Sequence, residues 1–362
     1  MKIEKDLKKD GIEVIKPLDM LSITLISKFV AEKISSCFPF LGLKYNELFI
    51  KISRIPMYIA KIPEGMSEAN YFYKNTSIYF KEGLSLQEMQ KFAIHEFIHN
   101  MQELKDKNGI LYRLGLCDFT KFKIYGMALN EGAVQLISSK VLKINKDFVK
   151  YYGIEFSSIS PNYYPIICNL VNQMAYITGE DVLIQSTLYC NDKFKNTFIK
   201  FCGEKTFFKC QNNLDIISDA EEKIVLANAK LQNDNLSDRI IARYAKQIYN
   251  YKKLITQAFV NTQNLIFTSY FSNNLNNLYS VQDIENFRIK LYNYKDLLGV
   301  TENYSYFNDF YIDMMMKLDE KYDFITGNNY IVPYKRSYIS IIFSKISKLI
   351  GLNNAQTYKL NN

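Results

Sequence analysis

Histidine is scarce in this chain of 362 residues, where it occurs only twice, and tryptophan is absent. Cysteine occurs six times but never as a CxxC pair, so the sequence holds no paired-thiol motif of a zinc ribbon or of a thioredoxin-like redox centre. The N-terminus, residues 1–10, is charged and leads into no secretory signal. We therefore expect a cytoplasmic protein with reduced, partly buried thiols.

Long apolar runs and dense basic patches are also missing. No stretch approaches the roughly 18 uninterrupted apolar residues of a membrane span. The net charge is +8, and the lysines are scattered rather than gathered among aromatic residues, so we expect no nucleic-acid partner. Residues 336–350 have an amphipathic, lysine-bearing pattern that predicts packing on the preceding helices, with contact to a membrane surface as the alternative.

What is present is the composition of a globular protein, with 48% apolar and 23% charged residues. The length exceeds what one compact core usually holds. We predict an α+β fold in three parts. Residues 1–84 would form a helix and a small antiparallel sheet, residues 85–215 a helical part packed on that sheet, and residues 216–362 a helical C-terminal domain.

The N-terminal part mixes helical and strand-like patterns. The apolar spacing over residues 18–38 predicts an amphipathic helix that stops at Pro39. Residues 47–61 alternate in a way that indicates a strand. Residues 71–80 predict a β-hairpin around the turn at 74–77.

From Ser85 onward the pattern is helical. Ser85 and Glu88 have the spacing of a capping box, and the helix that they open is predicted to run to about residue 104. Residues 111–122 are expected to be a connecting loop, and a second helix is expected over about 124–142. Further helices are predicted over 166–208 and beyond 215.

Both histidines belong to one motif, His95-Glu96-Phe97-Ile98-His99. Four residues apart on a helix, they lie on one face, one turn apart, where they can share a metal ion. The apolar residues of this segment fall on roughly the opposite side of the helix, so the histidines are expected to face a cleft or water rather than the core. Glu96 projects beside the same face and can accept a proton from a water molecule on the metal.

A catalytic zinc site needs a third protein ligand and an open position. Because no third histidine exists, this ligand should be a carboxylate, and Glu131 is the best candidate. It lies within an apolar helical stretch, where an unpaired carboxylate would be costly. Gly132 next to it weakens a helix but allows another element to approach the backbone closely.

The motif, followed by 30 residues and then Asn130-Glu131-Gly132-Ala133, resembles the gluzincin metallopeptidases, the superfamily of thermolysin and of aminopeptidases with an NExxA-like third-ligand helix. The resemblance covers roughly residues 45–145. It implies that His95, His99 and Glu131 hold Zn²⁺ and that Glu96 is the general base and proton shuttle. It also implies that an edge strand, here Asn70, Tyr71, Phe72 and Tyr73, binds an extended peptide or protein substrate.

The sequence departs from that family in two respects. Gln135 stands where many relatives have an acidic residue that orients a ligand histidine, and no histidine is left to stabilise an oxyanion. In the aminopeptidase branch a downstream tyrosine fills the second role. Tyr163, Tyr164 and Tyr176 are therefore the candidates here, the first two because Pro161 and Pro165 would hold their loop.

The sequence thus predicts a zinc-dependent peptidase. The alternative is a catalytically silent gluzincin-like scaffold that acts as a protein-interaction or membrane-surface module. Substrate identity, and the choice between endopeptidase and aminopeptidase, stay open.

Overall fold

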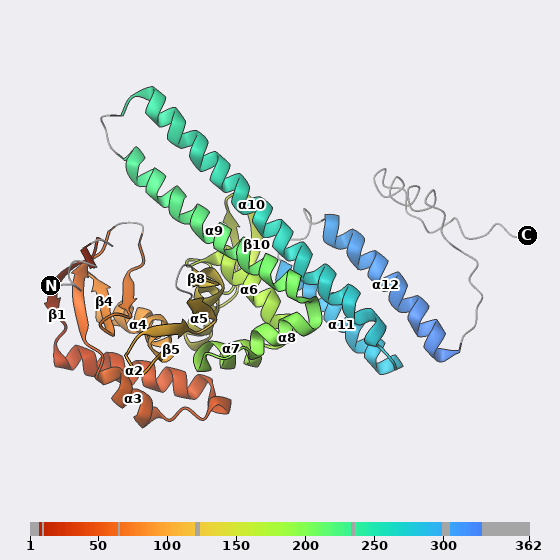
Figure 1. The fold of residues 1–362 in the computed structure, drawn as a ribbon, viewed down its shortest axis with the longest axis horizontal. Coiled ribbons are helices and arrows are strands. Elements are labelled where there is room, and N and C mark those ends of the chain that lie inside the picture. The colour runs from red at the N-terminus through yellow and green to blue at the C-terminus, as the bar shows by residue number, and fades with distance from the viewer. Residues whose placement is uncertain are drawn as a thin grey trace, which may run out of the picture.

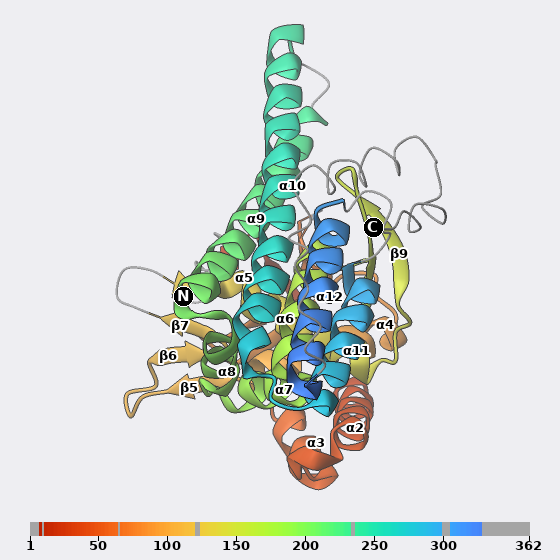
Figure 2. The same cartoon turned by 90° about the vertical axis from the view of Figure 1, so that its right-hand side faces the viewer.

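The computed structural model describes residues 7–8, 11–63, 66–119, 124–232, 236–298 and 305–327. The fold is α+β, as predicted, with small sheets in the N-terminal half and long helices toward the C-terminus (Figures 1 and 2). Within these ranges no helix combines the length and apolar character needed to cross a membrane. Residues 336–350, for which membrane contact was considered, lie outside the described ranges.

The N-terminal sheet has four strands in the order β1-β2-β4-β3, namely β1 (Glu13–Pro17), β2 (Met57–Lys61), β3 (Ala69–Phe72) and β4 (Ser77–Lys81). The predicted hairpin of β3 and β4 is confirmed. The prediction of a purely antiparallel sheet is wrong, because β2 and β4 are parallel. After β2 the chain enters β3 two strand positions away and returns as β4 in the position between them, so β3 becomes an edge strand.

The predicted strand over residues 47–61 is also wrong in its first half. Helix α3 (Tyr45–Ser53) precedes β2 and buries Leu48 and Ile52. Those two residues are one helical turn apart, and Ile55, also buried, continues the spacing. The buried residues before Met57 follow the period of a helix, so this segment is helical. The alternation that predicted a strand applies only from Met57 onward.

Helix α4 (Leu86–Met101) packs against β3 and β4 of this sheet, and α2 (Met20–Cys37), close to its predicted bounds, packs against α4. The predicted capping box begins α4, since the Ser85 Oγ accepts from the Glu88 N–H at 3.3 Å and Glu88 Oε2 accepts from the Ser85 N–H at 2.8 Å. The apolar face of α4 contributes Ala93 and Phe97 to the core.

Helix α4 ends three residues before the predicted position because the chain turns into a second sheet. That sheet has the order β5-β6-β7-β8, formed by β5 (Glu103–Lys105), β6 (Leu111–Leu114), β7 (Cys117–Phe119) and β8 (Ile124–Tyr125). The predicted loop over residues 111–122 thus contains two short strands. Strands of two to four residues are too short for alternation to reveal them.

Helix α5 (Met127–Val141) lies between the two halves of the molecule and contacts both α4 and α6 (Pro165–Thr178). A Cβ added to Gly132 of α5 would lie 2.7 Å from Ile167 Cγ2 and 2.8 Å from Val171 Cγ2. The close approach expected at Gly132 is therefore confirmed, and it is made by α6.

We expect Gly132→Ala to lower the free energy of unfolding by about 1 to 2 kcal/mol, because the overlap with α6 outweighs the better helix propensity of alanine. Chemical denaturation of both proteins measures this difference. A more stable variant would show that α6 can shift without cost.

The described residues also form a β-hairpin and six further α-helices, besides two 3₁₀ helices at Pro39–Leu41 and Leu275–Asn277. The hairpin strands and the six helices are β9 (Asp147–Tyr151), β10 (Ile154–Ser158), α7 (Glu180–Tyr189), α8 (Lys193–Cys202), α9 (Glu204–Leu231), α10 (Asp238–Asn274), α11 (Val281–Leu298) and α12 (Ser305–Thr326). The predicted division at residue 215 falls inside α9. One hydrophobic cluster runs from α5 and α6 into α12, so no separate core begins there.

Helices α9 and α10 form a long pair that projects from the body (Figures 1 and 2). At its inner end, Asp215 of α9 accepts hydrogen bonds at the start of α5, from the N–H groups of Ala128 at 3.2 Å and Gly126 at 3.4 Å. All six cysteines are free thiols, and five of them are buried, as expected.

Candidate metal centre

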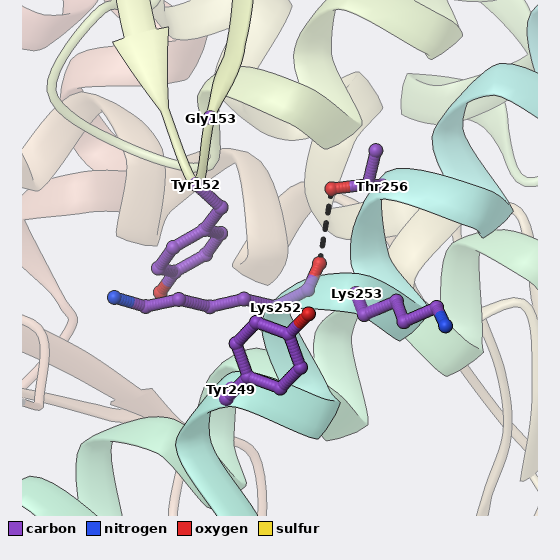
Figure 3. Close-up of a pocket in the computed structure, with 6 residues that line it drawn as sticks. All are labelled: Tyr152, Gly153, Tyr249, Lys252, Lys253 and Thr256. Atoms are coloured by element: carbon purple, nitrogen blue, oxygen red, sulfur yellow. Dashed lines mark hydrogen bonds between the residues drawn. The ribbon is translucent and has the colours of Figure 1, made fainter. Parts of the chain in front are cut away.

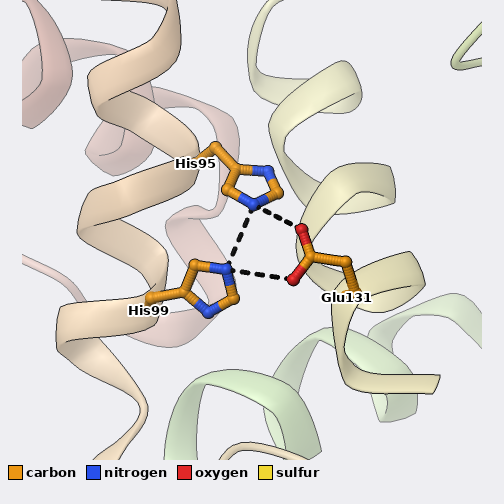
Figure 4. Close-up of side chains that lie close together, drawn as sticks. All are labelled: His95, His99 and Glu131. Atoms are coloured by element: carbon orange, nitrogen blue, oxygen red, sulfur yellow. Dashed lines mark hydrogen bonds and ion pairs between the residues drawn. The ribbon is translucent and has the colours of Figure 1, made fainter. Parts of the chain in front are cut away.

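Two facing helices bring His95, His99 and Glu131 together (Figure 4). The Nε2 atoms of the two histidines are 3.1 Å apart. Glu131 Oε1 lies 2.9 Å from His95 Nε2, and its Oε2 lies 3.3 Å from His99 Nε2. In the described part of the chain this is the one group of three or more His, Cys, Asp or Glu side chains that could hold a metal ion.

The spacing of these atoms fits a small ion with tetrahedral ligands. Bonds of about 2.0 to 2.1 Å place neighbouring ligand atoms about 3.3 Å apart. The three atom pairs lie at 2.9 to 3.3 Å, close to that separation. Two imidazole nitrogens and one carboxylate are also the donor set of many catalytic zinc sites.

The other nitrogen of His95 is held by a chain of hydrogen bonds. His95 Nδ1 lies 2.9 Å from Gln135 Oε1, Gln135 Nε2 donates to Ser160 Oγ at 2.9 Å, and Ser160 Oγ donates to the Tyr163 carbonyl at 2.6 Å. Since the Ser160 hydroxyl proton is committed to Tyr163, Gln135 must present its NH₂ to Ser160 and its oxygen to His95. His95 therefore donates its Nδ1–H to Gln135, which leaves Nε2, the nitrogen nearest Glu131 and His99, as the atom that can bind a metal ion.

A neutral amide thus performs the orienting role that the sequence left uncertain at Gln135. Ser160 was not foreseen, because a serine beside a proline carries no signal of a contact with a helix 25 residues earlier in the chain. His99 is less constrained: its buried Nδ1 has no hydrogen-bond partner among the described residues.

Burial and charge act differently on the two carboxyl groups of the site. For Glu131, burial raises the pKa, but the imidazoles of His95 and His99 outweigh it and hold the pKa below its usual range. For Glu96, burial is the largest influence and leaves the pKa raised. One carboxylate is therefore kept ionised, as a ligand must be, while the other is suited to exchange a proton.

Glu96 also contacts the edge strand. Its side chain is 6% exposed, and its Oε2 accepts a hydrogen bond from the Tyr71 N–H at 2.7 Å. The carbonyl of Glu68 accepts from the Lys81 N–H of the neighbouring strand, so the backbone groups of Tyr71 face the open edge of β3. The edge strand and the proposed base are thus directly connected, which the sequence did not indicate.

A cavity of about 580 Å³ contains His95, Glu96, His99 and Glu131. Of the four predicted edge-strand residues, Asn70, Tyr71 and Tyr73 line it. Phe72 does not, and its side chain lies in a small apolar cluster with Tyr79.

The three tyrosines proposed as oxyanion donors differ in whether they lie at the cavity. Tyr163 and Tyr164 line the cavity. Tyr176 does not, and its proposed catalytic role is wrong: its hydroxyl donates to the Lys290 carbonyl at 3.1 Å, and its ring packs on Tyr294. It lies on the side of α6 that faces α11.

Tyr164 has an unusual backbone. It adopts a left-handed conformation, with φ 49° and ψ 44°, as the residue before Pro165 at the start of α6. For a bulky side chain such a conformation is strained, and strained residues gather at functional sites. The charge of Glu131, followed by burial, raises the pKa of Tyr164 well above its usual value, so its hydroxyl keeps its proton and can donate it in a hydrogen bond.

A second hollow lies away from this cavity, between the turn of the β9–β10 hairpin and α10 (Figure 3). Tyr152, Tyr249, Lys252 and Lys253 line it, and the Thr256 hydroxyl donates to the Lys252 carbonyl at 3.0 Å. Both lysines are exposed. No carboxylate or imidazole accompanies them among its described lining residues, so the hollow offers no catalytic set.

No protein-family model, curated protein or solved structure matches this chain. The chemistry of the site therefore rests on its own geometry.

Proposed function

We propose that this chain is a zinc-dependent peptidase that hydrolyses peptide bonds, with Glu96 as general base. The observation that carries the proposal is the convergence of His95, His99 and Glu131 in a cavity that also holds Glu96. The similarity of the motif to gluzincins supports the same chemistry. A cytoplasmic location stays a prediction from the sequence.

Bound Zn²⁺ would supply Lewis acidity, which lowers the pKa of water and polarises a substrate carbonyl. His95 and Glu131 hold their ligand atoms in place through the contacts described above. Glu96, which is oriented by a hydrogen bond from the Tyr71 N–H, accepts the proton of the attacking water and delivers it to the leaving amine. The carbonyl of Tyr71 faces the open edge of β3, where an extended substrate can pair with it.

The negative charge that develops on the substrate carbonyl needs a hydrogen-bond donor. Tyr164 suits this role, because it lines the cavity, stays protonated and is held in a fixed conformation at the start of α6. Tyr163 also lines the cavity, but it is 37% exposed and its ring packs against Phe92.

We expect Tyr164→Phe to lower kcat by on the order of a hundredfold with the zinc content unchanged, as for the loss of other oxyanion donors. Tyr176→Phe is the matched control and should keep wild-type kcat, because its hydroxyl binds a distant carbonyl. Wild-type kcat in Tyr164→Phe would place the donor elsewhere.

The proposal as a whole is tested by elemental analysis of the purified chain together with hydrolysis of a denatured protein, followed by sequencing of the new N-termini. Zinc and cleavage together support the peptidase. Zinc without any cleavage would favour the alternative, a silent scaffold for protein interactions.

A further inference from the structure

The cavity continues beyond the metal-ligating group. Along α5, Gln135, Ser138 and Leu142 follow Glu131 at helical spacing, and all four line the cavity. Because an α-helix rises 1.5 Å per residue, Ser138 lies about 10 Å beyond Glu131 along the helix axis. A substrate side chain next to the cleaved bond would extend into this part of the cavity, which we call the α5 subsite.

Ser138 gives the subsite a polar end. Its side chain is 3% exposed, yet its Oγ has no hydrogen-bond partner in the described part of the chain. A buried helical serine commonly bonds back to a carbonyl one turn earlier, as Ser27 does to Ile23 at 2.7 Å. Ser138 does not make this bond, so its buried hydroxyl stays unpaired beside the cavity, at a cost of about 1 to 3 kcal/mol.

The walls of the α5 subsite are apolar and partly aromatic. Phe92 and Tyr163 meet edge to face, with ring centroids 6.0 Å apart, and Leu142 and Ile144 add aliphatic surface. Such walls favour a flat, largely apolar side chain.

Charge lies at the rim of the subsite and not at its buried end. Glu88 and Lys91 line the cavity but are exposed to solvent. Gln135 is neutral, and its amide already binds His95 and Ser160. Glu131, the charged residue of α5 that lines the cavity, lies about 10 Å from Ser138 along the helix axis, so a charged tip would reach the buried end without an opposite charge beside it.

We propose that the α5 subsite receives the side chain of a substrate tyrosine beside the cleaved bond, with the phenol hydrogen-bonded to Ser138 Oγ. This inference rests on the proposed peptidase function. Phenylalanine would fill the same walls but leave Ser138 unpaired. Lysine or arginine would bury an uncompensated charge.

Binding tests the subsite without any hydrolysis. In calorimetry or NMR titration, N-acetyl-tyrosinamide should bind the wild type about five- to tenfold more tightly than N-acetyl-phenylalaninamide, the difference expected for one neutral hydrogen bond. Ser138→Ala should abolish this preference by weakening the tyrosine compound only. Ser27→Ala, which alters a buried serine outside the cavity, should leave both affinities unchanged. Equal affinities in the wild type, or a preference that survives in Ser138→Ala, would overturn the proposal.

Cleavage then separates this inference from the function on which it rests. Sequencing of products from a denatured protein should show tyrosine enriched on one side of the cut, and the enrichment over phenylalanine should vanish in Ser138→Ala. Cleavage without tyrosine enrichment would refute the subsite and leave the peptidase intact. Selective binding of the tyrosine compound without cleavage would support the subsite and refute the peptidase.

Discussion

Replacing Glu96 with glutamine should abolish peptide hydrolysis, with a loss of on the order of a thousandfold or more, because an amide cannot accept the proton of the attacking water. Glutamine has nearly the same shape, and its side-chain oxygen can still accept the hydrogen bond from the Tyr71 N–H that Glu96 receives at 2.7 Å. Fold and metal content should therefore be unchanged. Single-turnover rates, elemental analysis and thermal unfolding measure the three quantities.

The control for this variant is Glu222→Gln, which removes an exposed carboxylate from α9, outside the cavity. It should keep the wild-type rate. Hydrolysis by Glu96→Gln at the wild-type rate would remove Glu96 from the mechanism. Loss of zinc from this variant would mean that Glu96 supports the metal centre itself.

The double variant His95→Ala/His99→Ala should contain no zinc, whereas the wild type should contain one ion per chain. Structural zinc sites with four ligands bind with about 10 to 16 kcal/mol, or roughly 3 kcal/mol per ligand, so each single variant should lose more than a hundredfold in affinity. Glu131→Ala should weaken binding in the same way. Competition with a chelator of known affinity measures each constant.

Full zinc occupancy in the double variant would refute the assignment of the metal centre. Replacement of Lys28 by alanine serves as a control, because this exposed residue of α2 lies outside the cavity. Unfolding curves show whether a loss of zinc follows from the missing ligand or from a loss of structure.

The grouping of His95, His99 and Glu131 was predictable because the sequence pattern that indicates it is local. Two histidines one turn apart define a helix face without knowledge of the fold, and Glu131 stood out as a carboxylate in an apolar stretch. The close contact at Gly132 followed for the same reason, since a glycine within a helix indicates a neighbouring backbone or side chain.

What the sequence could not show depends on contacts between distant segments. The parallel pairing of β2 with β4 is set by where β3 enters the sheet, and no residue pattern records it. Ser138 and Ser160 look like ordinary serines, and only the fold turns one toward the cavity and the other toward Gln135. Tyr176 is chemically equivalent to Tyr164, and only the fold places Tyr164 at the cavity, before α6 begins, and Tyr176 against α11.

The contact of Asp215 with the start of α5 also bears on how the protein matures on the ribosome. Helix α5 begins at Gly126 without a side-chain cap of its own, so Asp215 is the acceptor for its first N–H groups. That acceptor lies 87 residues after Ala128, which corresponds to about 4 to 17 s of synthesis at 5 to 20 residues per second. His95, His99 and Glu131 are thus all synthesised before the residue that accepts these N–H groups, and until then α5 depends on contacts with earlier elements such as α4.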